Sequence, residues 1–315
     1  MNNSIEFISL KAKQGDAFVI KWGGNNAMLI DGGMPSTLKQ IEDTIENCDL
    51  KFIFVSHVDY DHIAGLIKLV EQPSFNMTNI EHYMNYPELA LSPDDDTQVS
   101  FAHGENYATL LNKKGCKAIS ITDQDRISKF NVDIQVLTPN QTDLDKLLDD
   151  WNSNRIIKDE NIEYLKKQVS HGDIINKTSV SLLINIQELK FLMLADSHPQ
   201  DIIDKLEDMG YGIDNPLNVD ILKLSHHGSR HNTTVELLKR IKTENYYIST
   251  NGAKYDHPDE EIFECIIEAA DFHNSKESNI FTNYEIESEI KLKVNSDYLS
   301  RINIIHQERI KYNAL

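Results

Sequence analysis

The chain has 315 residues, of which 40% are hydrophobic and 26% are charged. This composition supports a large packed core and excludes disorder and collagen-like repetition. With 50 acidic and 31 basic residues, the net charge is −19. Such a charge disfavours wrapping of, or sliding along, nucleic acid, although metal ions can still supply positive charge at a local anion site.

The sequence favours the cytoplasm as its location. It contains no run of about 18 apolar residues, so no membrane-spanning helix is expected. Its first residues lack a basic segment followed by an apolar one, so no secretory signal is expected. The three cysteines, Cys48, Cys116 and Cys265, are too few and too far apart for a disulfide framework or a cysteine-rich zinc module.

The N-terminal part is predicted to be rich in strands. Asp31-Gly32-Gly33 ends the third strand, and Pro35 begins a helix in which Thr37 and Gln40 form a capping box. The strands predicted in this part span residues 5–10, 17–22, 27–30 and 51–55.

The remainder alternates between helices and strands. Apolar positions at helical spacing predict a helix after His62, and Thr233 and Glu236 predict a second capping box. A polar acidic loop is expected at 92–98 and weaker elements at 102–170. The other expected elements are a strand hairpin at 179–186 and 190–195, helices at 199–209 and 258–270, and strands at 219–224, 246–249, 278–282 and 288–294.

This order of elements favours the α/β class, with an αββα sandwich of two mixed β-sheets flanked by helices. We expect a single domain over residues 1–315.

Four side chains that can bind metal ions fall within six residues directly after the apolar strand at 51–55. They are His57, Asp59, Asp61 and His62. Carboxylates and imidazoles packed this closely require neutralising cations, and two divalent metals are the simplest solution. Further ligands are expected at other strand ends, where Asp196 and the pair His226-His227 stand.

These segments resemble the metallo-β-lactamase fold hydrolases, and within them the branch that contains the nuclease domain of the competence protein ComEC. The matching pieces occur in family order over about residues 5–260. They include Gln14-Gly15-Asp16-Ala17, Leu29-Ile30-Asp31-Gly32-Gly33, Ser56-His57-Val58-Asp59-Tyr60-Asp61-His62, Leu194-Ala195-Asp196, Ser225-His226-His227-Gly228-Ser229 and Asn251-Gly252 with His257-Pro258.

The resemblance implies a dinuclear site. His57 and Asp59 would hold one metal, Asp61 and His62 the other, and Asp196 would bridge them. His227 is preferred as a further ligand of the second metal and His226 as a contact to substrate phosphate, but the sequence leaves the choice between the two histidines open.

Two departures from the wider family pattern matter. Asp59 stands where a second histidine is usual, a feature shared with the ComEC-like branch. Asn176 stands where a third histidine is usual, 20 residues before Asp196, and His171 is an alternative ligand from the preceding loop. The resulting excess of oxygen donors makes Mn²⁺ as suitable as Zn²⁺ and argues against β-lactam hydrolysis.

Other residues are expected to contact the substrate or assist catalysis. Lys223, Ser229, Arg230 and His257 are candidate donors to a phosphate or a leaving oxygen. Lys223 is equally well explained as a strand lysine paired with a carboxylate. For His257 the alternative is a helix cap, but the functional role is favoured because His257-Pro258 belongs to the resemblance. Asp31 is expected either to accept from amides of its own turn or to support a metal-bound histidine, and Asp16 to serve its turn. The residues assigned to catalysis are Asp61, Asp196, Lys223, His226 and His257, with Ser229 and Arg230 in substrate binding.

The resemblance and the donor set together indicate a metal-dependent phosphodiesterase or nuclease, in which hydroxide activated by two metals attacks a nucleic acid or a nucleotide. One alternative is a small-molecule hydrolase of the same fold, such as a phosphocholine-type phosphodiesterase or a lactonase. Another is a non-catalytic subunit of a bacterial defence complex. Similar standalone proteins imply an ATPase or protease partner.

Overall fold

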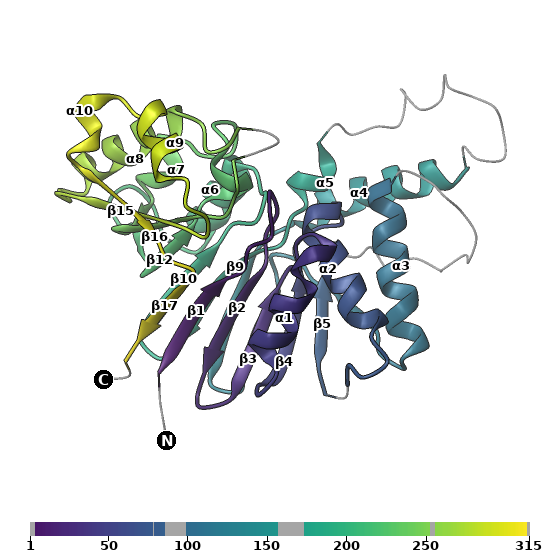
Figure 1. Ribbon diagram of the computed structural model, residues 1–315. Coiled ribbons are helices and arrows are strands. Elements are labelled where there is room, and N and C mark those ends of the chain that lie inside the picture. Colours follow the sequence, from purple (N-terminus) through teal and green to yellow (C-terminus); the bar gives the residue numbers. More distant parts are fainter. Residues whose placement is uncertain (1–3, 78, 86–98, 157–172, 253–255, 314–315) are drawn as a thin grey trace.

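The computed structural model describes residues 4–77, 79–85, 99–156, 173–252 and 256–313. Two large mixed β-sheets lie face to face, and helices cover their outer faces (Figure 1). The αββα class predicted from the sequence is confirmed.

Within the described residues, the first sheet has seven strands. They are β1 (Ile5–Ser9), β2 (Phe18–Trp22), β3 (Asn26–Ile30), β4 (Asp49–Val55), β5 (Glu81–Met84), β6 (Ala118–Ser120) and β17 (Arg309–Tyr312). Their order is β17–β1–β2–β3–β4–β5–β6, antiparallel from β17 to β3 and parallel from β3 to β6.

The second sheet has eight strands in the described part of the chain. They are β7 (Arg126–Lys129), β8 (Val132–Thr138), β9 (Ser181–Ile186), β10 (Leu189–Met193), β12 (Ile221–Lys223), β14 (Asn245–Ile248), β15 (Ser278–Thr282) and β16 (Ile302–His306). Their order is β16–β15–β14–β12–β10–β9–β8–β7, parallel from β16 to β10 and antiparallel from β10 to β7. β11 (Leu217–Asn218) and β13 (Ile241–Lys242) form a separate short pair.

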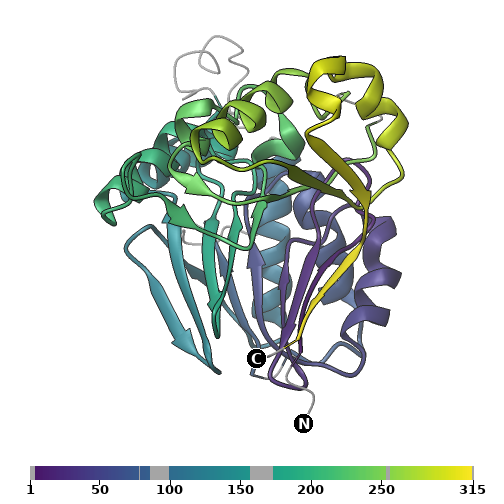
Figure 2. The same ribbon diagram turned by 90° about the vertical axis from the view of Figure 1, so that its left-hand side faces the viewer.

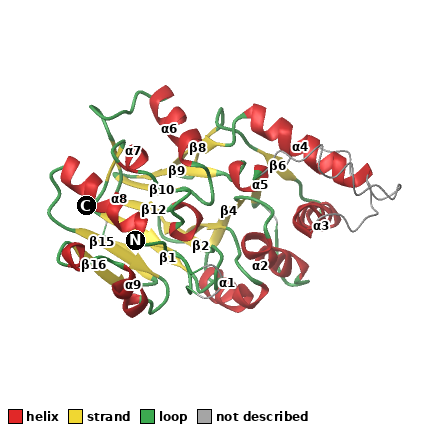
Figure 3. Ribbon diagram, turned by 90° about the horizontal axis from the view of Figure 1, so that it is seen from above, coloured by secondary structure: helices red, strands yellow, loops and turns green. Residues whose placement is uncertain are grey.

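The helices divide between the two outer faces, as the view from above shows (Figure 3). Those packed on the first sheet are α1 (Leu38–Ile45), α2 (Tyr60–Glu71), α3 (Val99–Lys113), α4 (Gln141–Ile156) and α5 (Ile174–Lys177). Those packed on the second sheet are α6 (Pro199–Asp208), α7 (Val235–Leu238), α8 (Glu261–Phe272), α9 (Glu287–Lys293) and α10 (Ser296–Leu299).

The space between the sheets is filled largely by aromatic side chains. Phe7 lies with its ring centroid 5.2–5.8 Å from those of Phe18, Phe191 and Tyr247. On β2, Phe18 faces this inner layer whereas Val19 faces the helices, as the alternation of a strand requires. Strands buried on both faces explain why the sequence shows short apolar runs instead of alternating polarity.

The prediction of a strand at 288–294 is wrong, because the segment contains α9. Ile290, Leu292 and Val294 alternate along the sequence, which indicated a strand. In the structure, Ile290 and Val294 are buried whereas Leu292 is 87% exposed, so the buried pair follows the four-residue spacing of a helix.

Both predicted capping boxes are also wrong. Gln40 does not return to Thr37; its side chain instead accepts from the Lys11 amide and donates to the Lys11 carbonyl. Thr234, and not Thr233, caps α7 by accepting from the Leu237 amide. A tertiary contact with Lys11 therefore replaces the first capping box, and the cap of α7 is shifted by one residue from the second.

The last strands, β16 and β17, were not predicted. β17 pairs with β1, so the C-terminal strand completes the sheet that the N-terminal strand begins (Figure 2). The region 102–170, for which only weak elements were expected, includes the long helices α3 and α4 and strands β6 to β8. The acidic loop expected at 92–98 lies outside the described residues.

Candidate metal site

The candidate site lies where parallel strands of both sheets end. Asp31 follows β3, the segment from Ser56 to Asp61 follows β4, Asp196 follows β10, and the pair His226-His227 follows β12. Carboxyl ends of neighbouring parallel strands meet at one edge of a sheet, and ligands of α/β proteins bind there. The two sheets therefore contribute side chains to one place.

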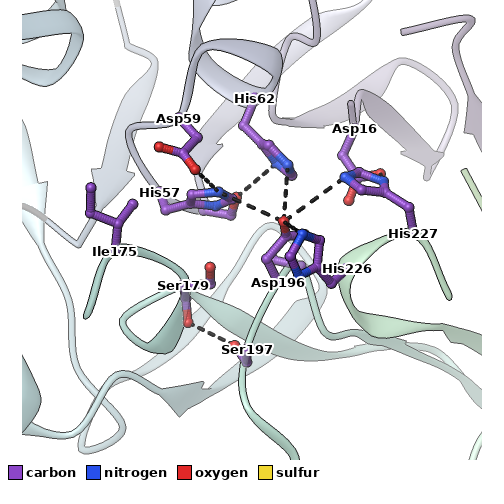
Figure 4. Close-up of polar contacts among 12 residues, drawn as sticks. Asp16, His57, Asp59, His62, Ile175, Ser179, Asp196, Ser197, His226 and His227 are labelled. Atoms are coloured by element: carbon purple, nitrogen blue, oxygen red, sulfur yellow. Dashed lines mark hydrogen bonds and ion pairs between the residues drawn. The ribbon is translucent and has the colours of Figure 1, made fainter. Parts of the chain in front are cut away.

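Asp196 occupies the centre of the site (Figure 4). Its Oδ2 atom lies 3.6 Å from Nε2 of His62 and 3.7 Å from Nε2 of His226. The Nε2 atoms of His57 and His227 each lie 3.9 Å from the same oxygen. Four imidazoles from two sheets thus turn their Nε2 atoms towards one carboxylate.

The Nδ1 atoms of the two histidines after β4 are held by a buried network. Asp31 Oδ2 lies 2.9 Å from Nδ1 of His62 and accepts a hydrogen bond from Ser56 Oγ at 2.6 Å. Because the Ser56 hydroxyl donates to Asp31, it is left to accept from Nδ1 of His57, which lies 3.0 Å away. Both imidazoles then carry their proton on Nδ1 and direct an Nε2 lone pair at the site.

The histidines after β12 are held in a similar way. Nδ1 of His227 lies 2.8 Å from the Ser249 carbonyl oxygen and 3.3 Å from Asp16 Oδ1. Nδ1 of His226 lies 3.2 Å from Asn232 Oδ1. These contacts occupy Nδ1 of both rings, so Nε2 is the atom that each ring turns towards Asp196.

The inward-facing atoms fit a metal ion. Nε2 of His57, Nε2 of His62 and Oδ1 of Asp196 are buried and have no hydrogen-bond partner among the described residues, an arrangement that is costly without a ligand. In the described residues, three overlapping groups have ligand atoms within 4.8 Å of one another, and all three contain His62. One consists of Asp16, Asp31 and His62, and the other two contain further predicted ligands. These two are His57, His62 and Asp196, and Asp61, His62 and His227.

The pKa shifts of the site residues also favour a bound cation. Burial raises the pKa of Asp196, but the surrounding imidazoles of His62, His227 and His226 outweigh it and hold this pKa well below its usual range. Burial disfavours charge on His62, yet Asp196 and Asp31 raise the pKa of His62 well above its usual value. Burial and the neighbouring His62 lower the pKa of His57. The buried Asp196 carboxylate is therefore stabilised by positive charge around it, which bound metal ions would also supply.

The backbone around the site is held in sparsely populated conformations. Asp31, Ala195, His226 and His227 all have φ between +46° and +58°. Non-glycine residues in this region cost energy and cluster at functional sites. Gly15 supplies a close approach, since a Cβ there would lie 1.7 Å from the Asp61 carbonyl oxygen.

The remaining predicted ligands are Asp59, Asp61, Asn176 and the alternative His171. Asp59 Oδ2 is 3.8 Å from Nε2 of His57, and Asp61 belongs to the group with His62 and His227. The sequence favours a position for Asn176 at the start of the strand that pairs with β10, but Asn176 lies on α5, five residues before β9. Its Oδ1 is buried without a hydrogen-bond partner in the described structure. His171 lies outside the described residues.

Of the predicted substrate contacts, His257 is placed near His226, with 5.7 Å between their ring centroids, and burial lowers its pKa. Ser229 is buried, and its Oγ accepts from the His231 amide. Arg230 is exposed and donates to Glu261 at 2.8 Å.

Lys223 is fully buried, and its ammonium contacts Asp16 and the Ala195 carbonyl. This is the ion-paired arrangement that the sequence left open. The expectation that Asp16 serves only its own turn is wrong, because Asp16 joins Lys223 and His227. Burial opposes ionisation of Asp16, but Lys223 and His227 together lower its pKa. Asp31 supports His62, which is one of its two expected roles.

Comparisons with known proteins agree with this architecture. The model of the metallo-beta-lactamase superfamily matches residues 10–146, fewer than half of the chain. The metallo-beta-lactamase fold protein YhfI from Bacillus subtilis superposes with a TM-score of 0.51 at 12% identity, covering 99% of this chain and 100% of that one. No curated protein matches the sequence.

Two further solved structures are less similar. A diphosphatase from the PhnP family has a TM-score of 0.48 at 11% identity, with 99% of this chain and 98% of that chain covered. A putative metal-dependent hydrolase from Parabacteroides distasonis has a TM-score of 0.40 at 12% identity, with 84% and 93% covered. The chain therefore has the metallo-β-lactamase fold, and candidate metal ligands cluster where strands of its two sheets end. In the described part of the chain, no helix is long and apolar enough to cross a membrane.

Proposed function

We propose that this protein is a metal-dependent hydrolase that cleaves phosphodiesters in a nucleic acid or a nucleotide. The observation that carries the proposal is the convergence of four imidazole Nε2 atoms on the carboxylate of Asp196, with the carboxylates of Asp59 and Asp61 beside them. A placement in the ComEC-type branch, and a partner ATPase or protease, belong to the proposal on resemblance alone.

Two divalent ions, Zn²⁺ or Mn²⁺, fit these donors. His57, Asp59 and Asp196, with Asn176, would hold the first ion, and Asp61, His62 and His227, with Asp196, the second. Bound ions of this kind act as Lewis acids and supply a nucleophile from water near neutral pH. The surrounding chain orients the ligands, since Asp31 and Ser56 fix the rings after β4 and Ser249 and Asp16 fix His227.

The donor set supports phosphoryl chemistry more than β-lactam hydrolysis. Three carboxylates, Asp59, Asp61 and Asp196, surround the imidazoles, and oxygen donors favour hard ions that bind phosphate oxygens. Lys223 and Arg230 are each engaged with a carboxylate, Asp16 and Glu261 respectively. Neutralisation of an anionic substrate would therefore depend mainly on the ions themselves.

The same charge balance favours a small or single-stranded substrate. A net charge of −19 repels a long duplex, whereas a short phosphodiester needs only local compensation at the metals. His226, whose side chain is partly exposed at the site, would contact a phosphate oxygen. His257 stands beside it, and burial lowers the pKa of His257.

The test is hydrolysis of bis-p-nitrophenyl phosphate, single-stranded DNA, duplex DNA and RNA by protein loaded with Mn²⁺ or Zn²⁺. A chromogenic cephalosporin serves as the competing substrate, and Asp204→Asn, at an exposed position on α6, as the control for Asp196→Asn. We expect diester hydrolysis that Asp196→Asn abolishes and Asp204→Asn retains. Faster cleavage of the cephalosporin than of the diester by the same preparation would contradict the proposal.

A further inference from the structure

We propose that Tyr60, supported by His103, forms a stacking surface for a nucleobase at the rim of the metal site. This inference rests on the proposed function and names the part of the substrate that the site recognises besides the phosphate. Tyr60 stands between the candidate ligands Asp59 and Asp61 at the first turn of α2, and His103 stands on α3.

Exposure changes sharply along the segment that carries the ligands. His57 and His62 are buried, whereas Tyr60 is 44% exposed and Asp59 is partly exposed. The open side of the site is therefore the side on which residues 59–61 lie. Of the large hydrophobic side chains that are exposed in the described residues, Tyr60 is the one that adjoins candidate metal ligands.

The Tyr60 ring has a partner that limits its motion. Its centroid lies 4.9 Å from that of His103, with the ring planes tilted by 40°. His103 is close enough to the site that the charge of Asp59 acts on it, opposing the pKa decrease that burial causes. An aromatic side chain that already contacts one ring loses little conformational freedom when a second ring stacks on its other face.

The position of His103 is itself fixed by close packing of α3. A Cβ at the neighbouring Gly104 would lie 2.7 Å from Val58 Cγ1 and 2.6 Å from the Trp151 ring. Val58 stands between the candidate ligands His57 and Asp59, so α3 is docked directly on the ligand segment. The indole of Trp151 donates to Glu105 at 2.9 Å, which ties α4 to the same turn of α3.

The chemistry of this surface suits a planar heteroaromatic ring next to a phosphate. Stacking of a base on an aromatic side chain is tolerant of sequence and contributes roughly 10-fold or more to binding. It requires no positive charge from the protein, which is compatible with an acidic chain that neutralises phosphate through metals. A nucleotide whose phosphate is bound by ions at Asp59 and Asp61 would bring its base towards the neighbouring Tyr60.

The test is calorimetric binding of adenosine 5′-monophosphate, ribose 5-phosphate and phenyl phosphate to protein loaded with Mn²⁺. We expect the nucleotide to bind roughly 10-fold more tightly than ribose 5-phosphate, and Tyr60→Leu to remove most of this difference while Tyr60→Phe retains it. His103→Leu should reduce it in part. The matched control is Phe272→Leu, which removes another exposed aromatic ring that is paired with a histidine, His273, away from the site.

The outcomes separate this inference from the proposed function. Equal affinity for adenosine 5′-monophosphate and ribose 5-phosphate, or a preference that survives Tyr60→Leu, overturns the stacking surface even if diesters are hydrolysed. An equal gain for phenyl phosphate overturns its assignment to a nucleobase. If the preference for the nucleotide depends on Tyr60 but no diester is hydrolysed, the result supports the stacking surface and contradicts the proposed hydrolase function. Metal content of each variant is measured alongside, and a loss of metal in Tyr60→Leu that accounts for its weaker binding counts against the inference.

Discussion

Asp31 Oδ2 lies 2.9 Å from Nδ1 of His62, and this buried contact fixes the ring that is common to the groups of candidate metal ligands in the described residues. Asp31→Asn removes the charge while keeping the shape. We expect a loss of about 10- to 100-fold in metal affinity, because the imidazole becomes a weaker and less oriented donor. Competitive titration with a chelating indicator measures this.

The control for this variant is Asp49→Asn, which removes an exposed carboxylate paired with Lys51 on the same sheet. Wild-type metal affinity in Asp31→Asn would show that the contact does not support the site.

Gly15 is expected to be intolerant of a side chain. A Cβ at this position would overlap the Asp61 carbonyl oxygen, so Gly15→Ala must displace either the turn before β2 or the start of α2. We expect the free energy of unfolding to fall by about 3 kcal/mol, with weaker metal binding. Denaturant unfolding measures the first effect. Gly212→Ala is the matched control, since a Cβ at Gly212 meets nothing within 4 Å. Equal stability of the two variants would refute the close approach.

His82 is expected to make the fold sensitive to acid. Its ring is buried with Nδ1 2.9 Å from the Tyr107 hydroxyl, and burial lowers the pKa of His82 to about 4. Between pH values of about 6.5 and 4, the unfolded chain binds a proton that the folded chain does not, so the free energy of unfolding falls as pH falls. The slope from this residue is at most about 1.4 kcal/mol per pH unit.

Urea unfolding of the metal-free protein from pH 7 to pH 4.5 measures that slope. His82→Asn should flatten it, whereas His231→Asn, which removes an exposed histidine, should leave it as in the wild type. An unchanged slope in His82→Asn would contradict the assignment.

Much of the site could be predicted because its ligands lie next to clear apolar strands. His57, Asp59, Asp61 and His62 follow β4 within six residues, and Asp196 and His226-His227 follow strands of the other sheet. The sequence left open that Lys223 pairs with a carboxylate, but it could not identify Asp16 as the partner, because the two residues are over 200 residues apart.

The elements of the fold were likewise predicted where a local sequence pattern indicates them and missed where none does. The layer order followed from the alternation of elements, whereas α9 was mistaken for a strand because a short apolar alternation fits both periods until burial is known. β17 was missed because its charged, half-exposed residues at the edge of the sheet carry no apolar run.

Asn176 is expected to complete the first metal position. Its buried Oδ1 has no hydrogen-bond partner in the described structure, and the Val180 amide ties the following strand to the Ser56 carbonyl beside His57. Asn176→Ala should weaken the ion held by His57 and Asp59, whereas His171→Ala should leave it almost unchanged. Metal titration of both variants tests this, and loss of one ion in His171→Ala alone would identify the histidine as the ligand.

The central claim is that Asp196 and the side chains around it would hold two divalent ions, and elemental analysis of protein equilibrated with Mn²⁺ or Zn²⁺ tests it most directly. We predict close to two metal equivalents in the wild type and in Asp204→Asn, and clearly fewer in Asp196→Asn with the fold intact by circular dichroism. A wild-type protein that binds no metal at saturating Mn²⁺ or Zn²⁺ would contradict the account.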